Sequence, residues 1–119
     1  ICQALKGKSL TIYGDGKQTR SFCYVDDLIS GMISLMNSNQ SGPVNIGNPN
    51  EFSINYLAKL IISKLNPNLD ISYKILPQDD PMQRKPDIGL AKKILDWEPK
   101  IQINEGLDIT IEYFRKILN

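Results

Sequence analysis

An aromatic ring and a guanidinium lie close together in this sequence, on either side of a glycine-containing bend. Tyr13 precedes Gly14 and Gly16, and Arg20 follows them. A flat ring can stack on a nucleotide base, and an arginine offers a planar fork to phosphate oxygens. The pair therefore indicates a ligand that contains a nucleotide, although a tyrosine in a strand and an arginine on a surface are more often merely structural.

The elements that must position these two side chains are short. Residues 10–13 and 21–25 are strand-forming runs on either side of the bend, and a helical pattern follows them. Asp26 and Asp27 are expected to cap that helix. Its apolar residues recur at helical spacing, and we expect this stripe to pack in the core. The stripe comprises Leu28, Ile29, Met32, Ile33, Leu35 and Met36.

The rest of the chain alternates loosely between helical and strand patterns. Apolar spacing predicts helices over residues 1–5, 54–65, 87–95 and 104–118. Gly7 is expected to end the helix at 1–5, and Pro67 the helix at 54–65. Ser53 is expected to cap the helix at 54–65, and Asp87 the helix that runs to residue 95. Residues 44–46 and 71–75 are expected to be strands, the latter half-buried. This alternation predicts an α/β fold with few strands.

Two further segments have a predicted role in packing or in connection. Residues 77–86 contain three prolines and cannot form a regular element, so a surface loop is expected. Trp97 follows the third predicted helix, and its indole is expected to pack inward.

Composition excludes several classes of function. The 119 residues carry 14 Lys and Arg against 13 Asp and Glu, so no net field recruits nucleic acid or an anionic membrane. No apolar run reaches the length of a membrane span. The absence of histidine excludes a Ser-His-Asp triad, a Cys-His pair and a His-ligated zinc site within this chain. We expect no metal site.

Cysteine usage and the N-terminus bear on compartment and completeness. Cys2 and Cys23 cannot form a disulfide framework and have no metal-ligand spacing, which favours reduced thiols in a cytoplasmic protein. Residues 1–6 do not have the composition of a signal peptide. The chain also begins without methionine and partway through an apparent helix, so we expect it to be a piece of a longer protein.

Two patterns resemble catalytic or cofactor motifs only by spacing. Tyr13 and Lys17 match Tyr-x-x-x-Lys, but the two glycines between them belong to a turn, and no helix aligns the pair. The Gly14-x-Gly16 pattern lacks the third glycine of a dinucleotide fingerprint and precedes a strand-like run. Neither pattern indicates a site in this chain.

Four segments together carry a resemblance to a known family. They are LTIYGDGKQTRSFCYVDDLISGM, GPVNIGNP, QDDPMQRKPDIGLAKKILDWEPK and EGLDITIEYFRKIL. This pattern resembles the C-terminal part of extended short-chain dehydrogenase/reductases, in the NAD-dependent epimerase/dehydratase superfamily. The Gln-Asp-Asp-Pro loop and Trp-Glu-Pro place the resemblance nearest the UDP-glucuronate decarboxylases.

The resemblance implies an architecture and a reaction. Residues 1–119 would be the C-terminal substrate-binding lobe of a longer enzyme, together with the last strand and helix of its NAD domain. The apolar faces of residues 28–36 and 44–46 would pack against the cofactor domain of the complete enzyme, and they would therefore lack a partner in this chain. In the family's reaction, NAD⁺ accepts hydride from C4 of the sugar, the β-keto acid loses CO₂, and NADH returns the hydride to give UDP-xylose.

The resemblance also implies site residues. Tyr13, Gln18 and Arg20 would lie around the nucleotide. Arg84 would lie near the diphosphate or the sugar carboxylate and could also be an accessory catalytic residue. The family's catalytic Tyr-x-x-x-Lys and its NAD-binding residues are not in this chain, so we expect NAD to be bound by a missing N-terminal domain and the chain alone to be inactive. A UDP-sugar is the expected partner, and a homodimer or a self-associated state is the expected assembly.

Other interpretations remain open at this stage. The parent enzyme could be a dTDP-glucose 4,6-dehydratase or a nucleotide-sugar epimerase, since the segments around Tyr13 are shared among these enzymes. A different class is a stand-alone nucleotide-binding α/β module. The sequence preceding Ile1 would discriminate a fragment from a module.

Overall fold

The computed structural model describes residues 1–118, which form two compact units. Unit 1 contains Ile1–Arg20, Phe52–Gln83 and the chain from Leu107 onward. Unit 2 contains Ser21–Glu51 and Arg84–Gly106. The chain therefore passes between the units four times, after Arg20, Glu51, Gln83 and Gly106.

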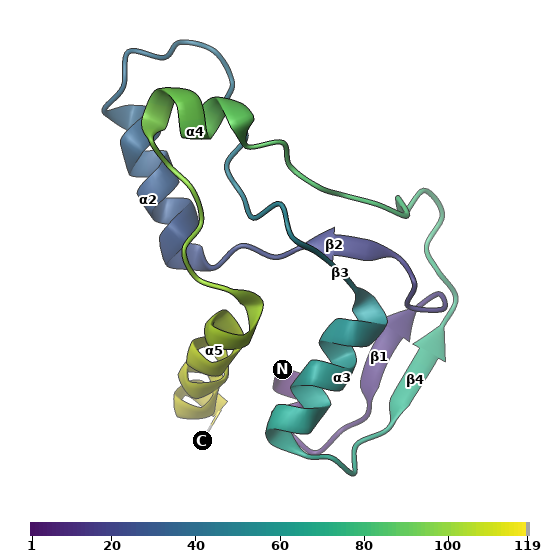
Figure 1. Ribbon diagram of the computed structural model, residues 1–119. Helices are drawn as coiled ribbons and strands as arrows, with labels where there is room; N and C mark the ends of the chain where they lie inside the picture. Colours follow the sequence, from purple (N-terminus) through teal and green to yellow (C-terminus); the bar gives the residue numbers. More distant parts are fainter. Residues whose placement is uncertain (119) are drawn as a thin grey trace. The chain divides into compact units, whose positions relative to one another are not determined.

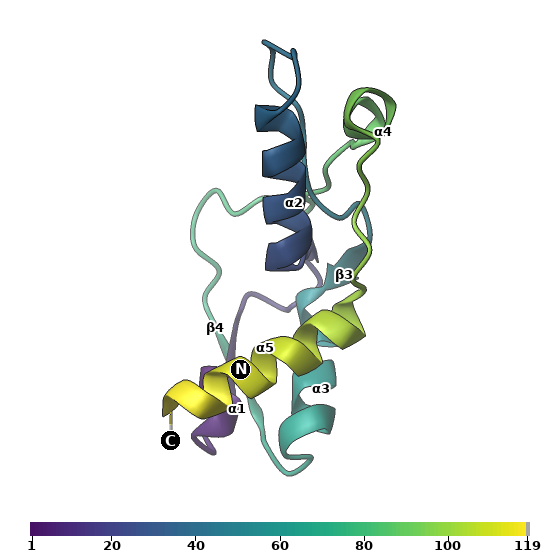
Figure 2. The same ribbon diagram turned by 90° about the vertical axis from the view of Figure 1, so that its left-hand side faces the viewer.

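Unit 1 is built around two parallel strands and a helix. Strand β1 (Leu10–Tyr13) pairs with β4 (Ile71–Lys74), and Leu10 lies opposite Ile71. Helix α3 (Ile54–Leu65) contacts β1 and the short helix α1 (Cys2–Leu5), as Figures 1 and 2 show from two sides. The core between them consists of Ala4, Leu10, Ile12, Ala58 and Ile61.

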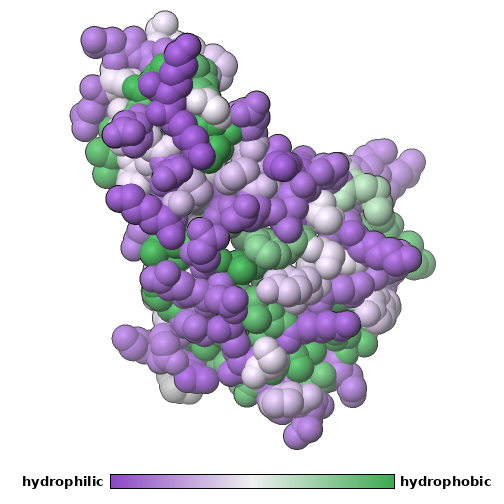
Figure 3. Space-filling view, in the orientation of Figure 1, coloured by the Kyte–Doolittle hydropathy of each residue, from purple (hydrophilic) through white to green (hydrophobic). Residues whose placement is uncertain are grey.

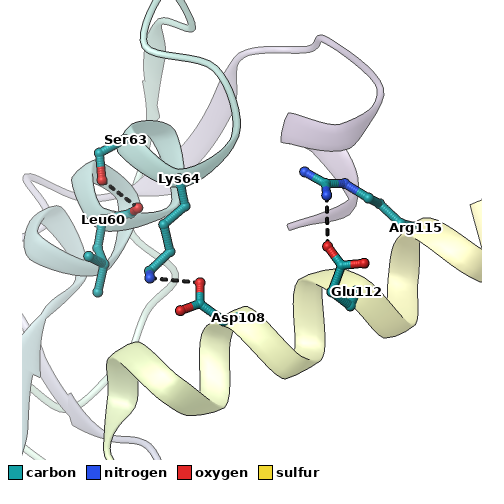
Figure 4. Close-up of polar contacts among 6 residues, drawn as sticks. All are labelled: Leu60, Ser63, Lys64, Asp108, Glu112 and Arg115. Atoms are coloured by element: carbon teal, nitrogen blue, oxygen red, sulfur yellow. Dashed lines mark hydrogen bonds and ion pairs between the residues drawn. The ribbon is translucent and has the colours of Figure 1, made fainter.

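The last helix, α5 (Ile103–Leu118), completes unit 1 with its residues from Leu107 onward. Leu107 packs against the core, and Ile111 is buried. At the surface, Lys64 of α3 and Asp108 of α5 point toward one another and form an ion pair of 2.7 Å (Figure 4). Because Asp108 is largely exposed, a pair of this kind contributes about 0–1 kcal/mol, and the buried apolar residues contribute more.

A second two-stranded sheet pairs β2 (Thr19–Ser21) with β3 (Glu51–Ser53). Both strands are three residues long, and the chain passes from one unit to the other within each of them.

Unit 2 holds helices α2 (Val25–Met36) and α4 (Gly89–Leu95), which contact one another (Figure 1). Its core consists of Ile88, Ala91 and Trp97, with Val44, Ile46 and Leu95 packed against them. A Cβ atom built on Gly31 of α2 would lie 2.9 Å from Cε2 of Trp97 and 2.6 Å from Cγ2 of Ile46. Only a glycine lets α2 approach the indole this closely.

Several predicted boundaries are confirmed. Helix α1 ends before Gly7, which has a φ of +65°, and α3 ends at Leu65, two residues before Pro67. The Ser53 hydroxyl accepts a hydrogen bond from the Tyr56 amide at 3.1 Å and so caps α3. Residues 77–86 contain no helix or strand, and Trp97 is buried.

The predicted strand at residues 21–25 is wrong. Strand β2 ends at Ser21, and Val25 is already the first residue of α2. The aromatic and β-branched residues of this run favour a strand only weakly, because strand propensity depends on what the side chains pack against. The two acidic residues in the first turn of α2, Asp26 and Asp27, favour a helix start instead.

Three other local predictions are wrong. Val44 and Ile46 belong to no strand, and their side chains pack against the Trp97 cluster from irregular backbone. Asp26 and Asp27 do not cap α2, because the capping position is Tyr24, which makes no side-chain capping bond. Asp87 does not cap α4, because that position is Ile88; the Asp87 carboxylate only accepts a hydrogen bond from the Gly89 amide at 2.9 Å.

Burial differs from prediction on β4 and on α2. Tyr73 is 56% exposed, and Ile75 lies beyond the strand and is 94% exposed, so the half-buried alternation predicted for 71–75 is wrong. The apolar stripe of α2 is not in the core either, since Met32 and Ile33 are each 52% exposed and Met36 is 80% exposed. This exposure is what is expected if the stripe lacks its partner in this chain. Figure 3 shows that hydrophobic residues reach the surface.

Candidate functional site

The glycine bend after β1 is held against the N-terminus of α3. Gly14 and Gly16 both have a φ of +74°, which favours glycine over every other residue. The Asn55 amide donates to the Gly16 carbonyl at 3.0 Å, and Asn55 Nδ2 donates to the Asp15 carbonyl at 2.8 Å. A Cβ atom on Gly16 would lie 2.2 Å from Asn55 Oδ1. The bend is therefore tightly packed, and it does not align Tyr13 with Lys17 on a helix.

Tyr13 and Gln18 stand at the two ends of this bend. Tyr13 is 48% exposed, so about half of its surface is open to solvent. Gln18 is buried, and its Nε2 donates to the Tyr13 carbonyl at 2.7 Å. The Gln18 carbonyl in turn accepts a hydrogen bond from the Ile54 amide at 3.1 Å. The Gln18 amide thus fixes the backbone that carries the tyrosine.

The Arg20 guanidinium is held on two sides. Its Nη1 donates to the Thr19 carbonyl at 2.7 Å, and its Nη2 donates to Oδ1 of Asp80 at 2.6 Å. The side chains of Arg20 and Asp80 are 19% and 31% exposed. This ion pair joins positions 60 residues apart in the sequence. Because it is partly shielded from water, its Coulombic attraction is screened less than that of a fully exposed pair.

Arg84 belongs to unit 2, whereas Tyr13, Gln18 and Arg20 belong to unit 1. Its carbonyl accepts a hydrogen bond from the Ser21 hydroxyl at 3.0 Å, which fixes the backbone at this point. Its side chain is exposed and forms no ion pair with any residue of 1–118. The Asp80 carboxylate, four positions before Arg84 in the sequence, is paired with Arg20 instead.

Asp27 and Trp97 form a buried polar anchor that the sequence did not predict. The Asp27 Oδ2 atom accepts hydrogen bonds from the Lys100 and Ile101 amides at 3.0 and 2.8 Å. Trp97 Nε1 donates to the Asp27 carbonyl and to Ser30 Oγ, at 3.2 and 2.9 Å. These bonds fasten the segment after α4 to the first turn of α2. The sequence indicated only that the Trp97 indole packs inward, ahead of Glu98 and Pro99.

Cys23 is not activated as a nucleophile. Burial raises the pKa of the Cys23 thiol, and the negative charge of Asp27 raises it further. The thiol therefore stays protonated at neutral pH, and a protonated thiol is a poor nucleophile and a poor metal ligand. Both cysteines are free thiols.

Within residues 1–118, no group of three or more His, Cys, Asp or Glu side chains is placed to hold a metal ion. Over the same residues, none of the helices has the length and apolar character needed to cross a membrane.

Comparison with known proteins finds relatives along nearly the whole chain. Residues 1–47 match the model of the NAD-dependent epimerase/dehydratase family. The UDP-glucuronic acid decarboxylase 1 of Xenopus tropicalis is 54% identical over 118 residues, which cover 99% of this chain and 28% of that protein. The UDP-glucuronic acid decarboxylase 3 of Arabidopsis thaliana is 50% identical over the whole chain, which spans 35% of that protein. The chain is therefore similar to UDP-glucuronic acid decarboxylases and spans only about a third of their length.

Solved structures of epimerase/dehydratase proteins share the fold. The UDP-glucose 4-epimerase of Thermotoga maritima, solved with UDP-glucose, aligns with a TM-score of 0.93 at 34% identity, over 98% of this chain and 38% of the epimerase. The UDP-glucuronic acid 4-epimerase of Bacillus cereus, solved with UDP-glucuronic acid and NAD, aligns with a TM-score of 0.90 at 28% identity, over 97% of this chain and 38% of its own. The predicted α/β fold class, as part of an epimerase/dehydratase fold, is confirmed.

Proposed function

We propose that this chain is the C-terminal, nucleotide-sugar-binding portion of an NAD-dependent UDP-glucuronate decarboxylase, which converts UDP-glucuronate to UDP-xylose and CO₂. The observation that carries the proposal is the 54% identity to a UDP-glucuronic acid decarboxylase across 99% of this chain. The 4-epimerase structures reach only 34% and 28% identity. This difference favours a decarboxylase over an epimerase.

The proposed substrate contacts come from Tyr13, Arg20 and Arg84. The exposed Tyr13 ring would stack on the base, and the Arg20 guanidinium would bind the diphosphate through N–H groups that Thr19 and Asp80 do not occupy. Gln18 would act by holding the Tyr13 backbone, since its amide is buried. Arg84, exposed and without an ion pair within residues 1–118, would bind the second phosphate or the sugar carboxylate.

We place the NAD site outside these residues. The bend at Gly14–Gly16 leads into β2, whereas a dinucleotide cradle leads into a helix N-terminus, so it does not fit the cofactor. When bound elsewhere in the longer protein, NAD supplies the hydride acceptor and donor of the reaction. The free thiols of Cys2 and Cys23 fit a reducing compartment, and we propose a cytoplasmic location.

A stand-alone nucleotide-binding module is the alternative from a different class. Product analysis separates it from the decarboxylase. The longer protein that contains this chain, incubated with UDP-glucuronate and NAD⁺, is expected to form UDP-xylose and CO₂. Formation of UDP-galacturonate would identify an epimerase, and binding of the nucleotide sugar without any product would identify a binding module.

The chain by itself is expected to have no decarboxylase activity. Its described residues offer neither a site that fits NAD nor the family's Tyr-x-x-x-Lys on a helix, so the hydride has no acceptor. Residues 1–119, purified and incubated with NAD⁺ and UDP-glucuronate, should yield no UDP-xylose above the protein-free control. Turnover at a rate of about 1 s⁻¹ or more would contradict the assignment of the cofactor site to another part of the protein.

The chain by itself is also expected to self-associate. The exposed stripe of α2, with Met32, Ile33 and Met36 more than half exposed, is apolar surface that seeks a partner. Light scattering at micromolar concentration should therefore detect dimers or larger species, and Met32→Lys with Ile33→Lys should shift them toward monomer. A monodisperse wild-type monomer would contradict the prediction. For the longer protein we propose a homodimer.

A further inference from the structure

We infer that Asp80 is a positioning residue, which holds the Arg20 guanidinium in the orientation that binds the phosphate groups of the substrate. The inference rests on the proposed function, because it takes Arg20 to be a phosphate ligand. The role is unexpected for Asp80, because the negative charge of its carboxylate repels the phosphate groups of the substrate.

The geometry of the contact carries the inference. Asp80 Oδ1 lies 2.6 Å from Arg20 Nη2, and the Thr19 carbonyl lies 2.7 Å from Nη1, so both terminal nitrogens are fixed. Arg20 has five N–H groups, and these two contacts use one hydrogen on each Nη atom, so that the Nε–H and the second hydrogen of each Nη take no part in them. A guanidinium already fixed in place loses less conformational entropy when it binds a phosphate.

The backbone around Asp80 is itself held in place. The Thr19 amide donates to the Met82 carbonyl at 2.9 Å, two residues after Asp80. Pro81 follows Asp80 directly, and Asp79 before it has a φ of +67°, a conformation that non-glycine residues rarely adopt. The carboxylate is therefore presented to Arg20 from a constrained loop, and the same loop is attached to β2 beside that arginine.

An opposite role makes the opposite prediction. If Asp80 were a stand-in for the ligand's phosphate, removing it would free the guanidinium and tighten binding. If Asp80 positions the guanidinium, removing it weakens binding, despite the loss of a negative charge that would repel the phosphates. The sign of the change therefore separates the two roles.

The experiment measures binding of UDP to the longer protein by calorimetry at fixed ionic strength. Asp80→Ala is expected to raise the Kd at least fivefold, and Asp80→Asn, whose amide oxygen can still accept the Arg20 hydrogen bond, should raise it less. Asp79→Asn is the matched control, because it removes the same charge from the neighbouring position and keeps a residue that tolerates positive φ. It should leave the Kd within twofold.

A double-mutant cycle tests whether Asp80 acts through Arg20. Once Arg20→Ala has weakened binding, adding Asp80→Ala should cause no further loss, whereas a merely structural role in the loop would make the two losses additive. An unchanged or lower Kd in Asp80→Ala, or additive losses, overturns the inference while leaving the proposed function in place. No effect of Arg20→Ala, or no UDP binding by the unmodified protein, overturns both.

Discussion

Replacing Arg84 by alanine in the longer protein is expected to lower kcat/KM for UDP-glucuronate at least tenfold. This loss corresponds to about 1.4 kcal/mol or more of transition-state stabilisation. The Arg84 side chain is exposed and forms no ion pair within residues 1–118, so it is available to a ligand, and Pro81 and Pro86 limit the freedom of its loop. UDP-glucuronate carries a diphosphate and a carboxylate, and a guanidinium can bind either of them with two hydrogen bonds.

The controls for this prediction are the neighbouring lysine and a conservative change. Arg84→Lys should recover little of the loss, because an ammonium cannot reproduce the planar fork. Lys85→Ala removes the same charge one residue away, and we expect it to change kcat/KM less than threefold. If Arg84→Ala retained near-normal kinetics with unchanged circular dichroism, Arg84 would have to be regarded as a solvated loop residue.

Replacing Trp97 by alanine is expected to lower the free energy of unfolding by about 3–5 kcal/mol. Its side chain is 6% exposed, it contacts α2 where Gly31 leaves space, and its Nε1 donates to Asp27 and Ser30. The alanine variant therefore loses a large buried apolar area and leaves a buried acceptor with one fewer donor. Urea unfolding of the longer protein, followed by circular dichroism, measures the change.

Two variants separate packing from hydrogen bonding in this anchor. Trp97→Phe keeps much of the apolar area but loses Nε1, so its cost should fall between those of the wild type and of Trp97→Ala. Tyr113 is 59% exposed on α5, and Tyr113→Ala should cost less than about 1 kcal/mol. A Trp97→Ala variant with unchanged stability would show that the Asp27–Trp97 anchor does not hold unit 2 together.

The parts of the fold that the sequence predicted correctly are those decided by local physical chemistry. Helix α3 begins after Ser53 because a hydroxyl can satisfy an orphan amide, and α1 ends before a glycine that accepts a positive φ. Tertiary contacts decided the parts that were predicted wrongly. Val44 and Ile46 look like a strand by residue type, but the Trp97 cluster gives their side chains a place without any strand partner.

The residues of the candidate site also differ in how far the sequence could predict them. Tyr13 and Arg20 could be grouped from the sequence because they flank one bend, and the family resemblance added Gln18. The partner of Arg20 lies 60 positions away and the amides bound by Asp27 lie 73 and 74 positions away, and no local pattern predicts a contact over such separations. The sequence shows only distance along the chain, so it did not group Asp80 with Arg20.

Because the chain crosses between the two units four times, each unit is built from segments that are far apart in the sequence. This arrangement determines when each unit can form during synthesis. Strand β1 is made early, yet its partner β4 follows about 60 residues later, and Leu107, which packs against the same core, is made later still. Unit 2 likewise waits for Trp97 and for the Lys100 and Ile101 amides that Asp27 binds. Neither unit is complete until nearly the whole of this chain has left the ribosome, so its apolar residues depend on late-arriving partners and are exposed to aggregation or to chaperones until then.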